Sequence, residues 1–170
     1  MAEWLGQVCP ALVGRARELA GRLAALLRDL ATVDRPLHGD FYAKQVLQGP
    51  DVGVLDFDEA GRGDPALDLG LFIAHLERDV VRGTIPPDRV EPVRASLLEG
   101  YRSAAELPDP ARVGLYTAVG LLRLAPHPFR SREPQWPERT GAMLERAEAV
   151  LRAVAPRKVG AAVRPVPQGR

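Results

Sequence analysis

The chain has 170 residues, of which 46% are hydrophobic, and a formal net charge of +1. This length allows one domain with a buried core, and the near-balanced charge excludes the strongly basic field typical of nucleic-acid-binding proteins. Cys9 is the single cysteine, which excludes an internal disulfide and fits a reducing compartment. The N-terminus lacks the basic and long apolar regions of a signal peptide, and no apolar run approaches the ~18 residues of a membrane span. We therefore expect a cytoplasmic protein with no nucleic-acid partner and no membrane contact.

The first third of the chain has the pattern of an amphipathic helix. Five leucines recur at helical spacing with arginines between them: Leu19, Leu23, Leu26, Leu27 and Leu30. The spacing predicts a helix from about Pro10 to Ala31, with a short helical lead-in near Trp4.

The next segment has the pattern of a β-hairpin. Two short apolar runs, Val46-Leu47 and residues 52–57, flank Gln48-Gly49-Pro50-Asp51. Pro and Asp at the centre suit a type I turn.

Helices are predicted for most of the remaining chain. Asp64 is a good N-cap and Pro65 fits a first helical position, and residues 66–74 are apolar nearly all round, which is typical of a buried helix. Three further helices are predicted, around residues 90–101, 113–124 and 143–154, the second stopped by Pro126 and Pro128. The Pro/Gly/Arg-rich residues 156–170 are expected to form a disordered tail. The fold class is therefore mainly α with a small β-hairpin (α+β), in one domain over residues 1–155.

Polar residues with a chemical pattern surround the predicted hairpin. Asp40 and Gln45 lie five residues apart in the loop of residues 37–47, and Asp56 and Asp58 lie in residues 54–58, at the end of the second strand. Phosphoryl transfer uses one carboxylate to orient the attacking hydroxyl, and an amide and a second carboxylate to hold Mg²⁺ against the nucleotide phosphates.

This pattern resembles the aminoglycoside phosphotransferase family, a branch of the protein-kinase-like fold. It reads H-G-D-x-x-x-x-(N/Q), then two hydrophobic residues with Asp and an aromatic, then G-D-P-x-x-D-L, and it extends from Leu37 to about Leu76. The resemblance implies the C-terminal lobe of a kinase-like fold. It further implies ATP as phosphate donor, Mg²⁺ as metal and a small-molecule hydroxyl as acceptor.

The resemblance also assigns roles to the catalytic and metal-binding positions. Asp40 is the expected catalytic base. Asp56 and Gln45 are the expected Mg²⁺ ligands, although the family more often has Asn where this chain has Gln45. Asp58 either faces the same metal or is solvated. Lys44 either contacts a phosphate or is an exposed loop lysine.

Three further residues are expected to support this site without touching substrate. His38 braces the loop, Asp64 caps the following helix, and Asp68 ties that helix to the catalytic loop. Two other histidines are expected outside the chemistry: His75 in the core and His127 in a loop.

The family normally places an N-terminal lobe before the catalytic loop. Here 37 residues precede His38, they have a helical pattern, and Lys44 is the first lysine. We expect the N-terminal lobe to be missing and this chain alone to be inactive. Three interpretations stay open: a fragment of a phosphotransferase, a split enzyme that needs a separate N-terminal lobe or a homo-oligomer, and a non-catalytic kinase-like binding module.

Overall fold

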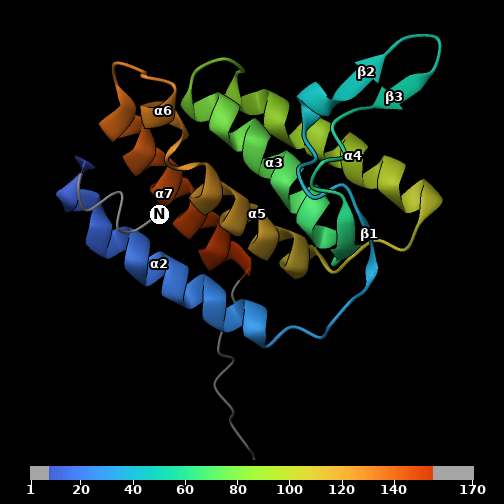
Figure 1. Cartoon of the computed structure of the whole chain (residues 1–170), viewed down its shortest axis with the longest axis horizontal. Helices are drawn as coiled ribbons and strands as arrows, with labels where there is room; N and C mark the ends of the chain where they lie inside the picture. Colours follow the sequence, from blue (N-terminus) through green and yellow to red (C-terminus); the bar gives the residue numbers. More distant parts are fainter. Residues whose placement is uncertain (1–7, 155–170) are drawn as a thin grey trace, which may run out of the picture.

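The computed structural model describes residues 8–154, and these fold into a mainly helical arrangement with two small antiparallel sheets (Figure 1). In chain order the elements are α2 (Pro10–Arg28), β1 (Arg35–Leu37), the 3-10 helix η1 (Ala43–Gln45), β2 (Val46–Gln48), β3 (Val52–Val54), β4 (Gly61–Gly63), α3 (Ala66–Val81), the 3-10 helix η2 (Pro87–Arg89), α4 (Val90–Ala104), α5 (Pro110–Leu124), α6 (His127–Arg130) and α7 (Trp136–Val154). The lead-in near Trp4 and the tail of residues 156–170 lie outside the described residues. Within the described part of the chain, every helix is too short or too polar to cross a membrane.

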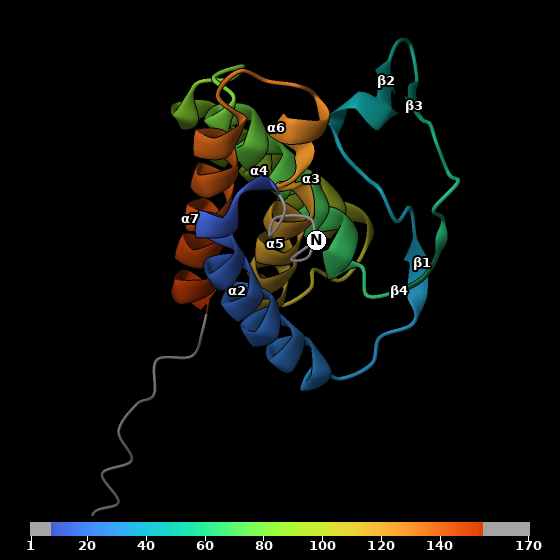
Figure 2. The ribbon, with the colours of Figure 1, turned by 60° about the vertical axis from the view of Figure 1, so that its left-hand side comes forward.

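The core is built around α3 and α5, which pack along each other. At Gly70 of α3, an added Cβ would lie 2.6 Å from Tyr116 Cβ and 2.7 Å from Thr117 N, so the close approach of the two helices requires glycine. Helices α2 and α7 cover the far side of α5, and Figure 2 shows the strands on the opposite side of the molecule. The largest fully buried apolar side chains come from these helices: Leu19, Leu71, Leu121, Met143, Leu144 and Leu151.

The prediction of a buried helix after Pro65 is confirmed. Every residue from Leu69 to Arg78 in α3 is buried. The polar ones need partners because a buried unpaired charge is costly, and Glu77 accepts two hydrogen bonds from Arg146 of α7, at 2.5 and 2.7 Å.

The predicted hairpin is also confirmed, although its second strand is shorter than expected. Strands β2 and β3 pair antiparallel, with Val46 opposite Val54. We expected the strand to continue to Phe57. It ends at Val54 because Asp56 has a φ of 63°, in the left-handed region that an extended strand cannot contain.

A second sheet was not predicted. Strand β1 pairs antiparallel with β4, with Leu37 opposite Gly61. Each strand has three residues, too few to show alternation, and Gly61-Arg62-Gly63 has the composition of a loop. The pairing joins the two ends of residues 38–60, which we call the closed segment, and the β2–β3 hairpin lies within it.

Helix ends differ from the sequence pattern in three places. Helix α2 ends at Arg28 and α7 already begins at Trp136. Pro126 and Pro128 stop α5 but also start α6, because proline is tolerated in the first turn of a helix. His127 therefore lies in a helix, and its assignment to a loop was wrong.

Candidate functional site

The start of the closed segment is held by Asp68 in the first turn of α3. The Asp68 carboxylate accepts hydrogen bonds from the backbone N–H of His38 at 2.8 Å and of Gly39 at 2.9 Å. Both oxygens therefore bind the same short stretch of loop. Charge-assisted bonds of this kind are stronger than neutral ones, so the loop immediately before Asp40 is fixed relative to the core.

Gly39 allows the two halves of the closed segment to touch. Its φ is +85°, and an added Cβ would lie 2.1 Å from Glu59 O. No other residue type adopts this conformation without strain or fits the space. The loop that contains Asp40 thus packs directly against the turn that follows Asp56.

His38 connects the catalytic loop to the segment that contains Asp56. Its buried ring donates from Nε2 to Leu55 O at 2.7 Å, and its Nδ1 accepts from Asp40 N at 3.4 Å. The ring lies 4.9 Å from the Phe57 ring and 5.6 Å from the Phe41 ring. One side chain therefore contacts Asp40 and Phe41 in one half of the segment and both neighbours of Asp56 in the other.

Gln45 and Asp56 meet, although the hairpin turn separates them in sequence. Gln45 Nε2 donates to Asp56 Oδ2 at 2.7 Å. Gln45 is buried at the end of η1 and Asp56 is exposed. Within residues 8–154, Gln45 Oε1 and Asp56 Oδ1 have no hydrogen-bond partner, so two oxygen atoms of this pair are available to a cation.

The other predicted carboxylate of this segment stands apart. Asp58 is exposed in the turn closed by the hydrogen bond from Ala60 N to Phe57 O, at 2.9 Å, and it makes no hydrogen bond with Gln45 or Asp56 in the described structure. Among residues 8–154, no group of three or more His, Cys, Asp or Glu side chains is placed to hold a metal ion. A metal here would need donors from a ligand as well.

Asp40 has a partner that the sequence did not indicate. The Arg123 guanidinium, in the last turn of α5, lies 3.3 Å from Asp40 Oδ1, with 53% of the Arg123 side chain and 32% of the Asp40 side chain exposed. Arg123 belongs to no recognised motif and lies 83 positions further along the chain, so only the tertiary structure could reveal this pair.

A buried neutral histidine lies beside this pair. The His75 ring stacks on the Tyr42 ring at 4.2 Å, and its Nδ1 has no hydrogen-bond partner among residues 8–154. Burial, as the largest cause, and the positive charges of Arg78, Arg123 and Lys44 together lower the pKa of His75 to about 3. The ring is therefore uncharged near neutral pH. Lys44 itself is exposed and has no ion pair within residues 8–154.

Asp64 lies away from this site and joins three elements. Its Oδ1 accepts from Ala66 N at 3.0 Å at the start of α3, and its Oδ2 pairs with Arg112 of α5. Arg112 also donates to Ala31 O at 2.5 Å. Asp64 therefore fixes the start of α3, and within the described structure it makes no hydrogen bond or ion pair with the closed segment.

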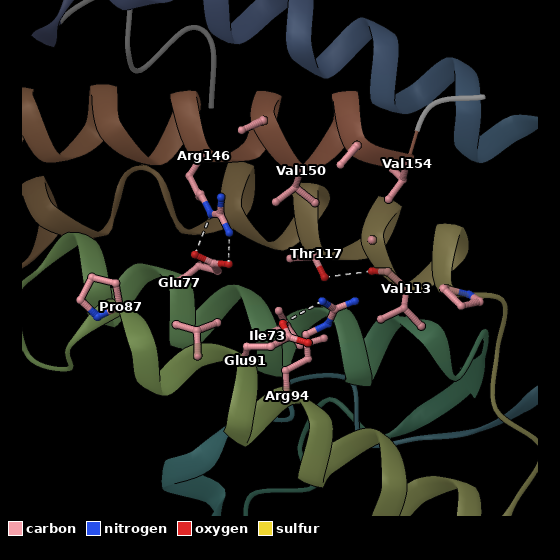
Figure 3. A pocket seen from close by; sticks show the side chains of 15 residues that line it. Ile73, Glu77, Pro87, Glu91, Arg94, Val113, Thr117, Arg146, Val150 and Val154 are labelled. Atoms are coloured by element: carbon pink, nitrogen blue, oxygen red, sulfur yellow. Dashed lines mark hydrogen bonds and ion pairs between the residues drawn. The ribbon is translucent and has the colours of Figure 1, made fainter. Parts of the chain in front are cut away.

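A separate pocket of about 330 Å³ lies between α3, α4, α5 and α7 (Figure 3). Its charged side chains pair with one another, Glu77 with Arg146 and Glu91 with Arg94. None of the sequence-predicted site residues lines it. The sequence-predicted site residues therefore lie outside this pocket, in the closed segment and at the start of α3.

The family model described as "Phosphotransferase enzyme family" matches residues 2–116, more than half of the chain. No curated protein and no solved structure matches the chain. The matched range contains the whole closed segment, α3 and α4.

Proposed function

The chain belongs to the phosphotransferase enzyme family, and from this premise we propose that it carries the catalytic loop and metal site of an ATP-dependent enzyme that phosphorylates a small-molecule hydroxyl. One observation carries the proposal. Asp40 and the Gln45–Asp56 pair belong to a single closed segment, which Asp68 anchors to the buried helix α3. This arrangement fixes the position of the Asp40 carboxylate relative to the oxygen atoms of Gln45 and Asp56.

Asp40 is the proposed catalytic base. Its side chain is one-third exposed, so an acceptor hydroxyl can reach it. Its loop is held from both sides by Asp68 and His38. A carboxylate in this position accepts the hydroxyl proton and aligns the oxygen with the γ-phosphorus.

Gln45 and Asp56 are the proposed Mg²⁺ ligands. Mg²⁺ prefers oxygen donors and is usually bound through one or two carboxylates together with substrate phosphates and water. The pair fits this requirement because it offers one carboxylate and one amide oxygen, and no larger acidic cluster. Such an ion would supply positive charge that neutralises the nucleotide phosphates. Asp58 and Lys44 are proposed as outer contacts, to the ion and to a phosphate respectively.

The hairpin side supports the proposal that this chain is the C-terminal lobe of a kinase-like fold. Five large apolar side chains of the closed segment are exposed: Leu47, Val52, Val54, Leu55 and Phe57. Exposed apolar groups gathered on one element mark a contact surface. We propose that the nucleotide and an N-terminal lobe cover this face.

The test is Mn²⁺ binding to the full-length protein in the presence of ATP, followed by electron paramagnetic resonance. Asp56→Asn and Gln45→Ala are expected to weaken Mn²⁺ binding at least tenfold, equivalent to ~1.4 kcal/mol. Gln48→Ala is the matched control, because Gln48 is exposed in β2 and contacts neither ligand. Unchanged Mn²⁺ affinity in Asp56→Asn refutes the metal assignment.

A further inference from the structure

Arg123 places an exposed positive charge directly beside the proposed catalytic base. Its guanidinium lies 3.3 Å from Asp40 Oδ1, and more than half of its side chain is exposed. An exposed ion pair is worth only ~0–1 kcal/mol. The small stabilisation from this ion pair therefore does not explain why a cation lies against the carboxylate that is proposed to orient the acceptor.

The surroundings of this pair are predominantly cationic. The pKa of His75 is lowered by burial first and then by neighbours that include Arg78, Arg123 and Lys44, so positive charges from η1, α3 and α5 lie near this ring. The pKa of His127 is likewise lowered, by burial first and then by arginines that include Arg78.

The acidic side chains of the same region are already neutralised. Asp79 binds Arg78 at 2.8 Å, and Glu133 binds Arg82 at 2.9 Å and Arg139 at 2.5 Å. Within residues 8–154, Lys44 has no ion pair and Arg123 pairs with Asp40 alone.

We propose that Arg123 binds an anionic group of the acceptor, so that the substrate is a hydroxy compound bearing a carboxylate or a phosphate. This inference rests on the proposed phosphotransferase function. The planar guanidinium binds either anion through two parallel hydrogen bonds. When the anion takes Arg123, Asp40 Oδ1 loses its ion-pair partner and can accept the hydrogen bond of the acceptor hydroxyl. A polycationic acceptor is disfavoured by the same charges.

The experiment uses four probes that share a three-carbon skeleton and a primary hydroxyl. D-Glycerate and glycerol phosphate are anionic, glycerol is neutral and serinol is cationic. Binding to the full-length protein is followed by nuclear magnetic resonance, through shifts of the Tyr42 and His127 ring protons. We expect at least one anionic probe to bind more than tenfold more tightly than glycerol, and serinol not to bind. The tighter of the two anions then identifies the carboxylate or the phosphate as the recognised group.

Variants assign the effect to Arg123. Arg123→Gln is expected to weaken anion binding about tenfold, whereas Arg102→Gln, an exposed arginine of α4 paired with Glu99, leaves it unchanged. Asp40→Asn is expected to strengthen anion binding several-fold, because Arg123 is then released and one negative charge is removed. Equal affinity in wild type and Arg123→Gln, or binding of serinol as tight as that of the anions, overturns the inference.

The two proposals fail separately in these measurements. Mn²⁺ affinity in the presence of ATP depends on Gln45 and Asp56, not on Arg123. Intact Mn²⁺ binding with no anion binding rejects only the acceptor class. Anion binding that depends on Arg123, with no effect of Asp56→Asn on Mn²⁺, rejects the phosphotransferase assignment and leaves an anion site.

Discussion

The carboxylate of Asp68 accepts a hydrogen bond from the backbone N–H of Gly39 at 2.9 Å, across 29 residues of the chain. Its second oxygen accepts from the neighbouring His38 N–H. The position of the loop before Asp40 is therefore set by a helix that is buried in the core. Because α3 is fixed in the core, this contact also restricts the movement of the partly exposed Asp40 carboxylate that is proposed for chemistry.

Asp68→Asn is expected to lower the free energy of unfolding by ~1–3 kcal/mol. The asparagine side chain has only one oxygen, so the backbone N–H of either His38 or Gly39 would face the amide N–H and lose its acceptor. The measurement is urea unfolding followed by circular dichroism. Asp51→Asn in the exposed hairpin turn is the control and is expected to change stability by less than ~0.5 kcal/mol. A loss of only a few tenths in Asp68→Asn would mean that the carboxylate acts on the helix dipole alone.

Gly39→Ala is expected to displace the catalytic loop. The residue has a φ of +85°, and its Cβ would lie 2.1 Å from Glu59 O. Overlap of this kind typically costs ~1–3 kcal/mol, and the left-handed conformation adds ~1 kcal/mol. Gly49→Ala, whose Cβ would lie no closer than 3.6 Å to a neighbouring atom, is the control. Equal unfolding midpoints for the two variants would contradict the close packing of the two halves of the segment.

The sequence predicts those parts of the fold that depend on local spacing. The apolar run after Pro65 identifies α3, and the Pro50-Asp51 turn identifies the β2–β3 hairpin. The β1–β4 pair escapes prediction because three-residue strands carry no periodicity, and their pairing depends on contacts between residues 35–37 and 61–63.

The candidate site likewise contains residues that the sequence marks and one residue that only the tertiary structure reveals. The residue types and spacing of Asp40, Gln45 and Asp56 mark them from the sequence, because each lies in a recognisable pattern. Arg123 carries no such signal, since it is one of many arginines on amphipathic helices. Its contact with Asp40 follows from how α5 packs beside α3, and helix packing angles are not encoded by any short motif.

His75 makes stability dependent on pH. Its pKa is about 3 in the folded protein and about 6.5 in the unfolded chain, so the unfolded state binds more protons between these values. Stability therefore falls as the pH falls below 6.5. Between pH 6.5 and pH 5 the loss attributable to His75 is expected to be about 1.5 kcal/mol.

His75→Phe is the variant that tests this dependence. Phenylalanine preserves the stack on Tyr42, and the Nδ1 atom that it removes has no hydrogen-bond partner. Unfolding free energies at pH 6.5 and pH 5 are expected to differ much less in the variant than in the wild type. The pH dependence of the unfolding free energy that remains in the variant is expected to come from His127, because burial lowers the pKa of His127 as well. An identical slope in both proteins would show that His75 is protonated in the folded state.

Asp40→Asn is the variant that isolates the catalytic carboxylate. Asparagine keeps the shape of the side chain but cannot accept the proton of the acceptor hydroxyl, and turnover of the active enzyme is expected to fall ~10²–10⁴-fold. The fold is expected to persist, because the lost pair with Arg123 is exposed and worth at most ~1 kcal/mol. Mn²⁺ affinity in the presence of ATP is expected to persist as well, because the contact between Gln45 and Asp56 does not involve Asp40.

Turnover and Mn²⁺ affinity therefore have to be measured side by side for wild type and Asp40→Asn, both in an enzyme reconstituted with an N-terminal lobe, with Asp51→Asn as the control for a change of charge. A loss of turnover alone assigns Asp40 to the acceptor hydroxyl. A parallel loss of Mn²⁺ affinity assigns it to the metal instead. Unchanged turnover removes Asp40 from the reaction, and the Arg123–Asp40 pair is then an ordinary surface contact that no acceptor needs to open.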